Sequence, residues 1–170
     1  MKNTIKNKTP IVVELRPNRD VTYSGICLKE SHEVFILIGL NEDTLEYDGI
    51  IIIRSHEIEE YRYLESDESS NITIKDYEEI INSLTLNRMN TFYECLDFLK
   101  KKDLIAIYTE DDDESYYIGK IINLSNKSVT IELISKDGKW LKPEEITIKD
   151  ITYLGFDSSY EKELMKKIYD

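Results

Sequence analysis

The sequence predicts a mainly β protein with helices, built as two small, strongly bent five-stranded barrels joined by a helical segment and followed by a C-terminal helix. Short apolar and β-branched runs, separated by polar turns, recur in two stretches of the chain, a pattern typical of small antiparallel sheets. Between the two stretches the apolar spacing changes to the 3.6-residue period of a helix. The two stretches are also similar to each other in sequence.

An internal repeat relates the two β-rich stretches. Tyr, Gly and Ser recur at a constant offset of 94 residues, Tyr23, Gly25 and Ser31 matching Tyr117, Gly119 and Ser125. We expect five strands in each copy: 11–15, 21–28, 33–40, 50–54 and 58–64 in the first, and 104–108, 116–124, 128–134, 145–148 and 152–156 in the second. Gly25 and Gly119 lie inside strands, which indicates a sharp bend or a close backbone approach.

Helices are predicted between the copies and at the C-terminus. Tyr77, Ile80, Ile81 and Leu84 form one helical face, and a second helix is expected from Asn90 to Lys101. Ser158 or Ser159 could cap the last helix. The predicted organisation is a first barrel with a basic N-terminal arm over 1–66, a linker with helices over 67–102, and a second barrel with the C-terminal helix over 103–170.

Composition restricts the function classes. The chain has 170 residues and a net charge of -12, so phosphate backbones are repelled and nucleic acid is not the expected partner. Its apolar runs fall well short of the ~20 residues that span a bilayer, and no secretory signal is expected. Cys27 and Cys95 lie far apart without a CxxC motif, which favours a reduced, cytoplasmic protein.

A glycine in the second strand of each copy, and Ile53-Arg54-Ser55 after an Ile-rich fourth strand, resemble the Sm-like fold. The resemblance covers most of residues 10–64 and 90–156. It implies barrels that pair edge to edge, and hence self-association. It also implies uridine-rich RNA binding through an Asp and an Asn, but the matching places are taken by Ser31 and Phe35 in one copy and by Ser125 and Val129 in the other.

A second resemblance brings no function with it. Tyr47-Asp48-Gly49 before an apolar strand and Gly138-Lys139-Trp140 at a turn are similar to a scattered group of uncharacterised bacterial proteins.

Catalytic and metal-binding signatures are absent from the sequence. The chain has no Gly-x-Ser-x-Gly, Walker or dinucleotide-binding motif, so we expect no enzyme, no cofactor and no bound metal. A metal-dependent hydrolase is one alternative, since His32 and His56 lie on two predicted turns and could share a metal or general-base site. The run Asp111 to Glu114 could gather a cation, but it is more typical of a solvated hairpin tip.

The leading hypothesis is a binding protein that acts by protein–protein interaction, for example an inhibitor, an immunity protein or an accessory factor for a basic partner. Its acidic charge would steer such a partner, and Trp140 beside a predicted turn is the best aromatic anchor. The alternative is small-ligand or RNA binding through cationic side chains. The candidate residues for contact with a partner or ligand are Arg16, Arg19, Arg54, Trp140 and Lys149.

Overall fold

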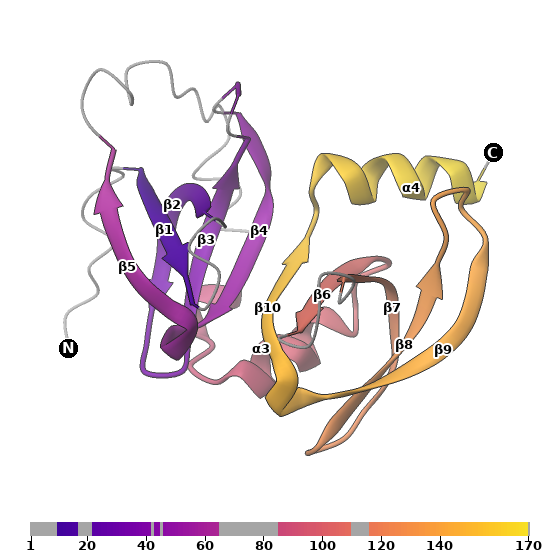
Figure 1. The fold of residues 1–170 in the computed structure, drawn as a ribbon. Helices are drawn as coiled ribbons and strands as arrows, with labels where there is room; N and C mark the ends of the chain where they lie inside the picture. The colour runs from indigo at the N-terminus through magenta and orange to yellow at the C-terminus, as the bar shows by residue number, and fades with distance from the viewer. Residues whose placement is uncertain are drawn as a thin grey trace. The chain divides into compact units, whose positions relative to one another are not determined.

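A computed structural model of the chain describes residues 10–16, 22–41, 43–44, 46–64, 85–109 and 116–169. The chain divides into two compact units, Met1–Thr91 and Phe92–Asp170, and both are built mainly from β-strands (Figure 1). The expected linker at 65–70 and the expected helix around Tyr77 to Leu84 lie outside the described residues.

In its described residues, the first unit contains five strands in the order β5-β1-β2-β3-β4. They are β1 (Ile11–Leu15), β2 (Thr22–Glu30), β3 (Val34–Leu40), β4 (Tyr47–Arg54) and β5 (Ile58–Tyr63), with a short 3-10 turn η1 (Ser55–Glu57) between the last two and η2 (Thr85–Arg88) after them. Each neighbouring pair is antiparallel. Every residue of β3, which lies between β2 and β4, is buried, so this strand contributes fully to the core.

Short polar contacts fix the β2–β3 connection. The Ser31 backbone N–H donates to the Val34 carbonyl at 2.9 Å, and Ser31 Oγ accepts from the Val34 N–H at 3.1 Å. Lys29 Nζ on β2 donates to Asn90 Oδ1 at 2.9 Å. The segment after η2 is therefore attached to the end of β2 within the first unit.

The strands of the second unit are arranged as in the first, in the order β10-β6-β7-β8-β9. It contains α3 (Phe92–Leu99), β6 (Ile105–Thr109), β7 (Tyr116–Leu124), β8 (Ser128–Ile134), β9 (Trp140–Thr147), η3 (Ile148–Asp150), β10 (Ile151–Phe156) and α4 (Ser159–Tyr169). Leu164 of α4 packs on Leu104, Ala106, Ile118 and Ile134, so the C-terminal helix covers one apolar face of the sheet.

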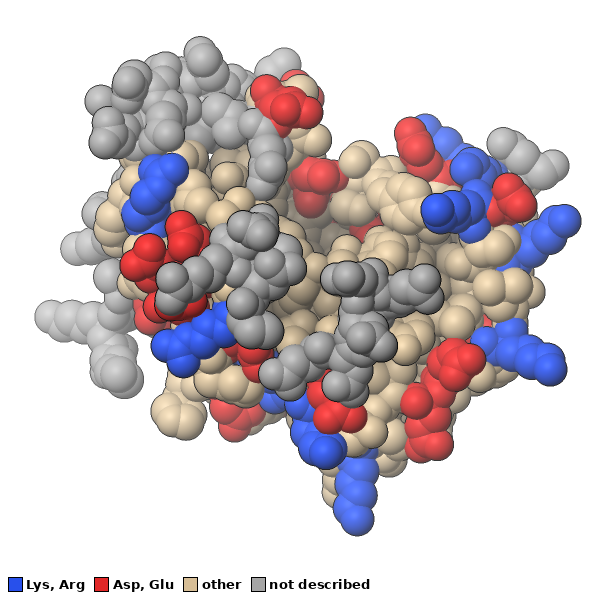
Figure 2. Space-filling view, in the orientation of Figure 1, with Lys and Arg blue, Asp and Glu red and all other residues tan. Residues whose placement is uncertain are grey.

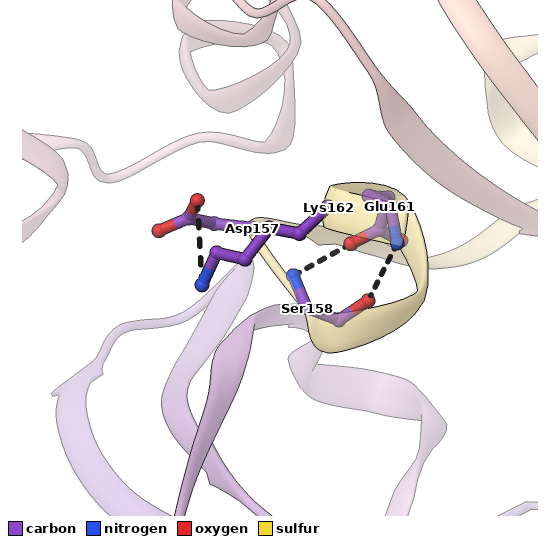
Figure 3. Close-up of polar contacts among 4 residues, drawn as sticks. All are labelled: Asp157, Ser158, Glu161 and Lys162. Atoms are coloured by element: carbon purple, nitrogen blue, oxygen red, sulfur yellow. Dashed lines mark hydrogen bonds and ion pairs between the residues drawn. The ribbon is translucent and has the colours of Figure 1, made fainter. Parts of the chain in front are cut away.

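The N-terminus of α4 is held by reciprocal hydrogen bonds. The Ser158 backbone N–H donates to Glu161 Oε2 at 2.6 Å, and the Glu161 N–H donates to Ser158 Oγ at 3.4 Å (Figure 3). This is a capping box, which pairs backbone donors that the first helical turn leaves without partners. Asp157 just before it has a φ of 68° and lies 3.8 Å from Lys162 Nζ.

The two strand glycines allow close backbone approaches, as the sequence predicts. A Cβ atom on Gly25 would lie 2.5 Å from the Ile38 carbonyl oxygen, and one on Gly119 would lie 2.0 Å from the Glu132 carbonyl oxygen. Both distances are shorter than a carbon and an oxygen can approach. Each of these strands therefore approaches its neighbour so closely at this point that only glycine fits.

The prediction of two closed five-stranded barrels joined by a helical segment is wrong. The strands form an open antiparallel sheet. Among the described residues, β5 does not pair with β4, and β10 does not pair with β9, so neither set of five strands closes into a barrel. Local sequence patterns specify neighbouring strand pairs, but closure depends on contact between the first and last strands of an order, which those patterns do not encode. The α-helices in the described part of the chain are α3 and α4.

Candidate functional site

A small acidic hollow lies beside β5 in the first unit. It has a volume of about 220 Å³ and is lined by Glu30, Phe35, Ser55, Ile58, Glu59, Glu60 and Tyr61. In Figure 2, acidic side chains gather over the part of the first unit where Figure 1 shows β5. Small-molecule sites typically enclose ~300–1,000 Å³, so this hollow suits a single side chain better than a whole cofactor.

Four elements, β2, β3, η1 and β5, meet to form the hollow. Glu30 ends β2 and lies opposite Phe35 at the start of β3, while η1 turns the chain from β4 into β5. The turn is fixed by Ser55, whose N–H donates to the Glu33 carbonyl at 3.0 Å and whose Oγ donates to the Ser31 carbonyl at 2.9 Å. Because the first residue of the turn is tied to the β2–β3 connection, β5 starts next to Glu30.

Aromatic rings form one wall of this site. The Phe35 and Tyr61 ring centroids are 5.7 Å apart, and Tyr63 meets Tyr61 edge to face at 6.5 Å. Phe35 is buried, whereas Tyr61 and Tyr63 are exposed. The rings thus run from the core to the surface, with the carboxylates beside them.

The electrostatics of the hollow are anionic. Glu30 is the main cause that raises the pKa of Tyr61, because a nearby carboxylate opposes formation of tyrosinate. Burial, followed by Glu30, raises the pKa of the Cys27 thiol to about 11. Glu60 also lies opposite Glu14 across the β1–β5 pair, and like charges in that position destabilise a sheet. A cation in the hollow would offset the charge of Glu30, the carboxylate that acts on Tyr61.

The second unit has backbone positions that match those of the hollow, but no acidic residues occupy them. Leu124 lies opposite Val129 across β7 and β8 as Glu30 lies opposite Phe35, and β10 begins after η3 as β5 begins after η1. The residues that follow the first residue of β10 are Thr152, Tyr153 and Leu154. An acidic lining is therefore not required by this arrangement of strands, which marks it as a property of the first unit.

The structure places Arg16 and Arg54 near one acidic residue rather than around an anion site. The Arg16 backbone N–H donates to the Glu57 carbonyl at 2.7 Å. Burial lowers the pKa of Arg54, while Glu57 and Glu33 act in the opposite direction. Because the carboxylates of Glu57 and Glu33 act on its charge, Arg54 is poorly suited to bind phosphate.

The other predicted contact residues do not join the hollow. Trp140 is exposed at the start of β9, and Lys149 in η3 lies 3.6 Å from Asp150, both in the second unit. Arg19 lies outside the described residues, as does the acidic run from Asp111 to Glu114.

The two histidines do not form a metal site. His32 and His56 are exposed, and His56 Nε2 lies 2.8 Å from Glu57 Oε1. Across the ranges that the structure describes, no group of three or more His, Cys, Asp and Glu side chains could hold a metal ion.

Comparisons with protein-family models, with curated proteins and with solved structures found no match. The resemblance to Sm-like proteins therefore stays a prediction. Within the described residues, no helix has the length and apolar character needed to cross a membrane.

The sequence did not predict that the acidic residues of the hollow lie together. They come from β2 and β5 and meet only when η1 brings the two strands together. One signal was present: Glu59-Glu60-Tyr61 occupies a strand, although Glu is depleted in strands and charged side chains need a reason to be there.

Proposed function

We propose that this chain is a non-enzymatic binding protein that recognises a positively charged segment of another protein through the acidic hollow. The observation that carries the proposal is the lining of one side-chain-sized cavity by three glutamates and two aromatic rings. A partner of this kind fits an inhibitor, an immunity protein or an accessory factor. The two free cysteines suit the reducing cytoplasm.

A lysine or arginine side chain matches the chemistry of the hollow. Its aliphatic stem could lie on Ile58 and the Phe35 ring, since such stems readily cover apolar surface. Its cationic end would meet Glu30, and the face of Tyr61 could add ~0.5–2 kcal/mol of cation–π attraction. Carboxylates and rings together select a cation with an apolar stem over a bare metal ion.

Long-range charge favours the same partner. The net charge of -12 attracts basic proteins and repels acidic ones, which raises association rates at low salt. Charge of this kind acts over about 10 Å at 0.1 M salt, so the hollow is needed to give specificity at contact. The absence of the acids from the matching positions of the second unit supports a single recognition site.

A matched pair of double variants tests the proposal. Glu30→Leu with Glu60→Gln removes two charges from the hollow, the first change copying the residue at the matching position of the second unit. Glu144→Gln with Glu163→Gln removes two charges from exposed residues of the second unit. The probe is an acetylated, amidated heptapeptide of alternating lysine and valine, titrated by calorimetry.

The hollow variant should bind the peptide about tenfold more weakly, equivalent to ~1.4 kcal/mol, and the control variant should match the unchanged protein. Equal weakening of both variants would mean that only net charge matters. Unchanged binding in the hollow variant would place the site elsewhere. Either result overturns the proposal.

A further inference from the structure

β5 lies at the end of the strand order in the first unit. Its partner is β1, and no second strand pairs with it among the residues that the structure describes. The hollow runs along this strand, since Ile58, Glu59, Glu60 and Tyr61 are consecutive in it. Within the described part of the chain, the strand that lines the site is therefore also a sheet edge.

The hydrogen-bond pattern shows which backbone groups face that edge. The Leu64 N–H donates to the Pro10 carbonyl at 2.9 Å, and Tyr63 lies opposite Ile11 in the next pair. Backbone groups of successive residues in a strand point to opposite sides. The N–H and C=O groups of Tyr61 and Tyr63 consequently point away from β1 and are oriented to pair with an added strand.

The two terminal strands differ in how they are protected against added strands. β9, which ends the order of the second unit, contains Pro143 within its span. Proline removes a donor and blocks edge pairing. β5 contains no proline, and with Glu59 and Glu60 against Arg62 its net negative charge favours a basic strand over an acidic one.

We propose that the basic partner binds as an extended strand that pairs with the outer edge of β5 and places a lysine or arginine side chain in the hollow. This inference rests on the proposed function and adds the conformation of the partner. Backbone hydrogen bonds to Tyr61 and Tyr63 supply affinity, and the acidic hollow selects the side chain, as in other strand-addition complexes. Charge complementarity between Glu30 and the basic side chain identifies the occupant.

The test compares two probes on the full chain. One is the alternating lysine–valine heptapeptide, and the other is the same peptide with its five central backbone nitrogens methylated, which keeps every side chain and removes strand pairing. We expect the methylated peptide to bind about tenfold or more weakly, because backbone donors are lost. Hydrogen exchange at the Tyr61 and Tyr63 amides should slow only with the unmethylated peptide.

The outcomes separate the two proposals. If both peptides bind equally and the two amides exchange at unchanged rates, the inference fails while the proposed function survives. If neither peptide binds, both fail. If the protein alone is a dimer by light scattering and both amides are already protected, a second copy is the occupant of this edge, which also overturns the inference.

Discussion

Glu60 lies directly opposite Glu14 across the antiparallel pair of β5 and β1. Two carboxylates in this position repel each other, and cross-strand pairs of this kind change stability by ~0.2–1 kcal/mol. The matching strand of the second unit, β10, has Tyr153 opposite Tyr108, so the sheet does not need this charge pair. A like-charge pair beside a hollow is consistent with a site that binds a cation at a cost to the stability of the free protein.

Glu60→Gln should therefore stabilise the free protein by up to about 0.5 kcal/mol and weaken peptide binding at the same time. Urea unfolding measures the first effect and calorimetric titration the second. The gain in stability should shrink in 1 M salt, where the Debye length falls to about 3 Å. Glu144→Gln, on the exposed surface of the second unit, is the control and should change neither quantity; a loss of stability in Glu60→Gln would contradict the interpretation.

Tyr61 should report on the charge of the hollow. Since Glu30 is the main cause of its raised pKa, Glu30→Gln is expected to lower the pKa of Tyr61. Binding of a lysine peptide should move it in the same direction, because a cation favours tyrosinate. NMR titration with labelled tyrosine side chains measures both shifts. An unchanged Tyr61 titration in the variant would show that Glu30 does not act on this ring.

Cys27 makes stability depend on alkaline pH. Its pKa is raised from 9.0 to about 11 in the folded protein, chiefly by burial. The unfolded chain loses the thiol proton first, so the stabilising contribution is fully present below pH 9 and is lost as the pH rises toward 11. Unfolding of Cys27→Ser over this range should show a weaker pH dependence than the unchanged protein.

The thiol should also react slowly with iodoacetamide at pH 8 and faster as the pH rises to 11, since the thiolate is the nucleophile. Mass spectrometry separates Cys27 from the fully buried Cys95, which should stay unmodified while the protein is folded. Rapid alkylation of Cys27 at pH 8 would contradict the raised pKa.

Strands with a regular alternation were predictable from the sequence, whereas features that depend on distant partners were not. The spans 116–124 and 128–134 agree with β7 and β8. β-branched residues alternate with polar ones in β8, and β7 is rich in Ile and Tyr. β9 was expected at 145–148 but begins at Trp140. Pro143 weakens the strand signal, yet a strand at the end of the order can tolerate a proline that forms no ladder bond on its outer side. The hollow depends on the meeting of β2, η1 and β5, which no local pattern specifies.

Alanine at either strand glycine should destabilise its own unit strongly. At Gly119 the added Cβ would lie 2.0 Å from the Glu132 carbonyl oxygen, against 2.5 Å from Ile38 at Gly25. The obstacle is backbone in both cases, so relief needs a shift of the neighbouring strand, and we expect a cost of about 3 kcal/mol, at the upper end for overpacking. Chemical denaturation should rank Gly119→Ala as the more damaging change. Equal stability to the unchanged protein would mean that the strands do not approach so closely.

The capping box of α4 should behave as a coupled pair. Ser158→Ala removes the Oγ acceptor, and Glu161→Ala removes the carboxylate that accepts from the Ser158 N–H; each should cost about 1 kcal/mol. Glu161 is only 5% exposed, so its alanine variant also loses packing.

Because each side chain bonds the backbone of the other residue, a displaced helix start weakens both bonds together. The double variant should then cost less than the two single variants added, as measured by urea unfolding. Full additivity would show that the two hydrogen bonds form independently.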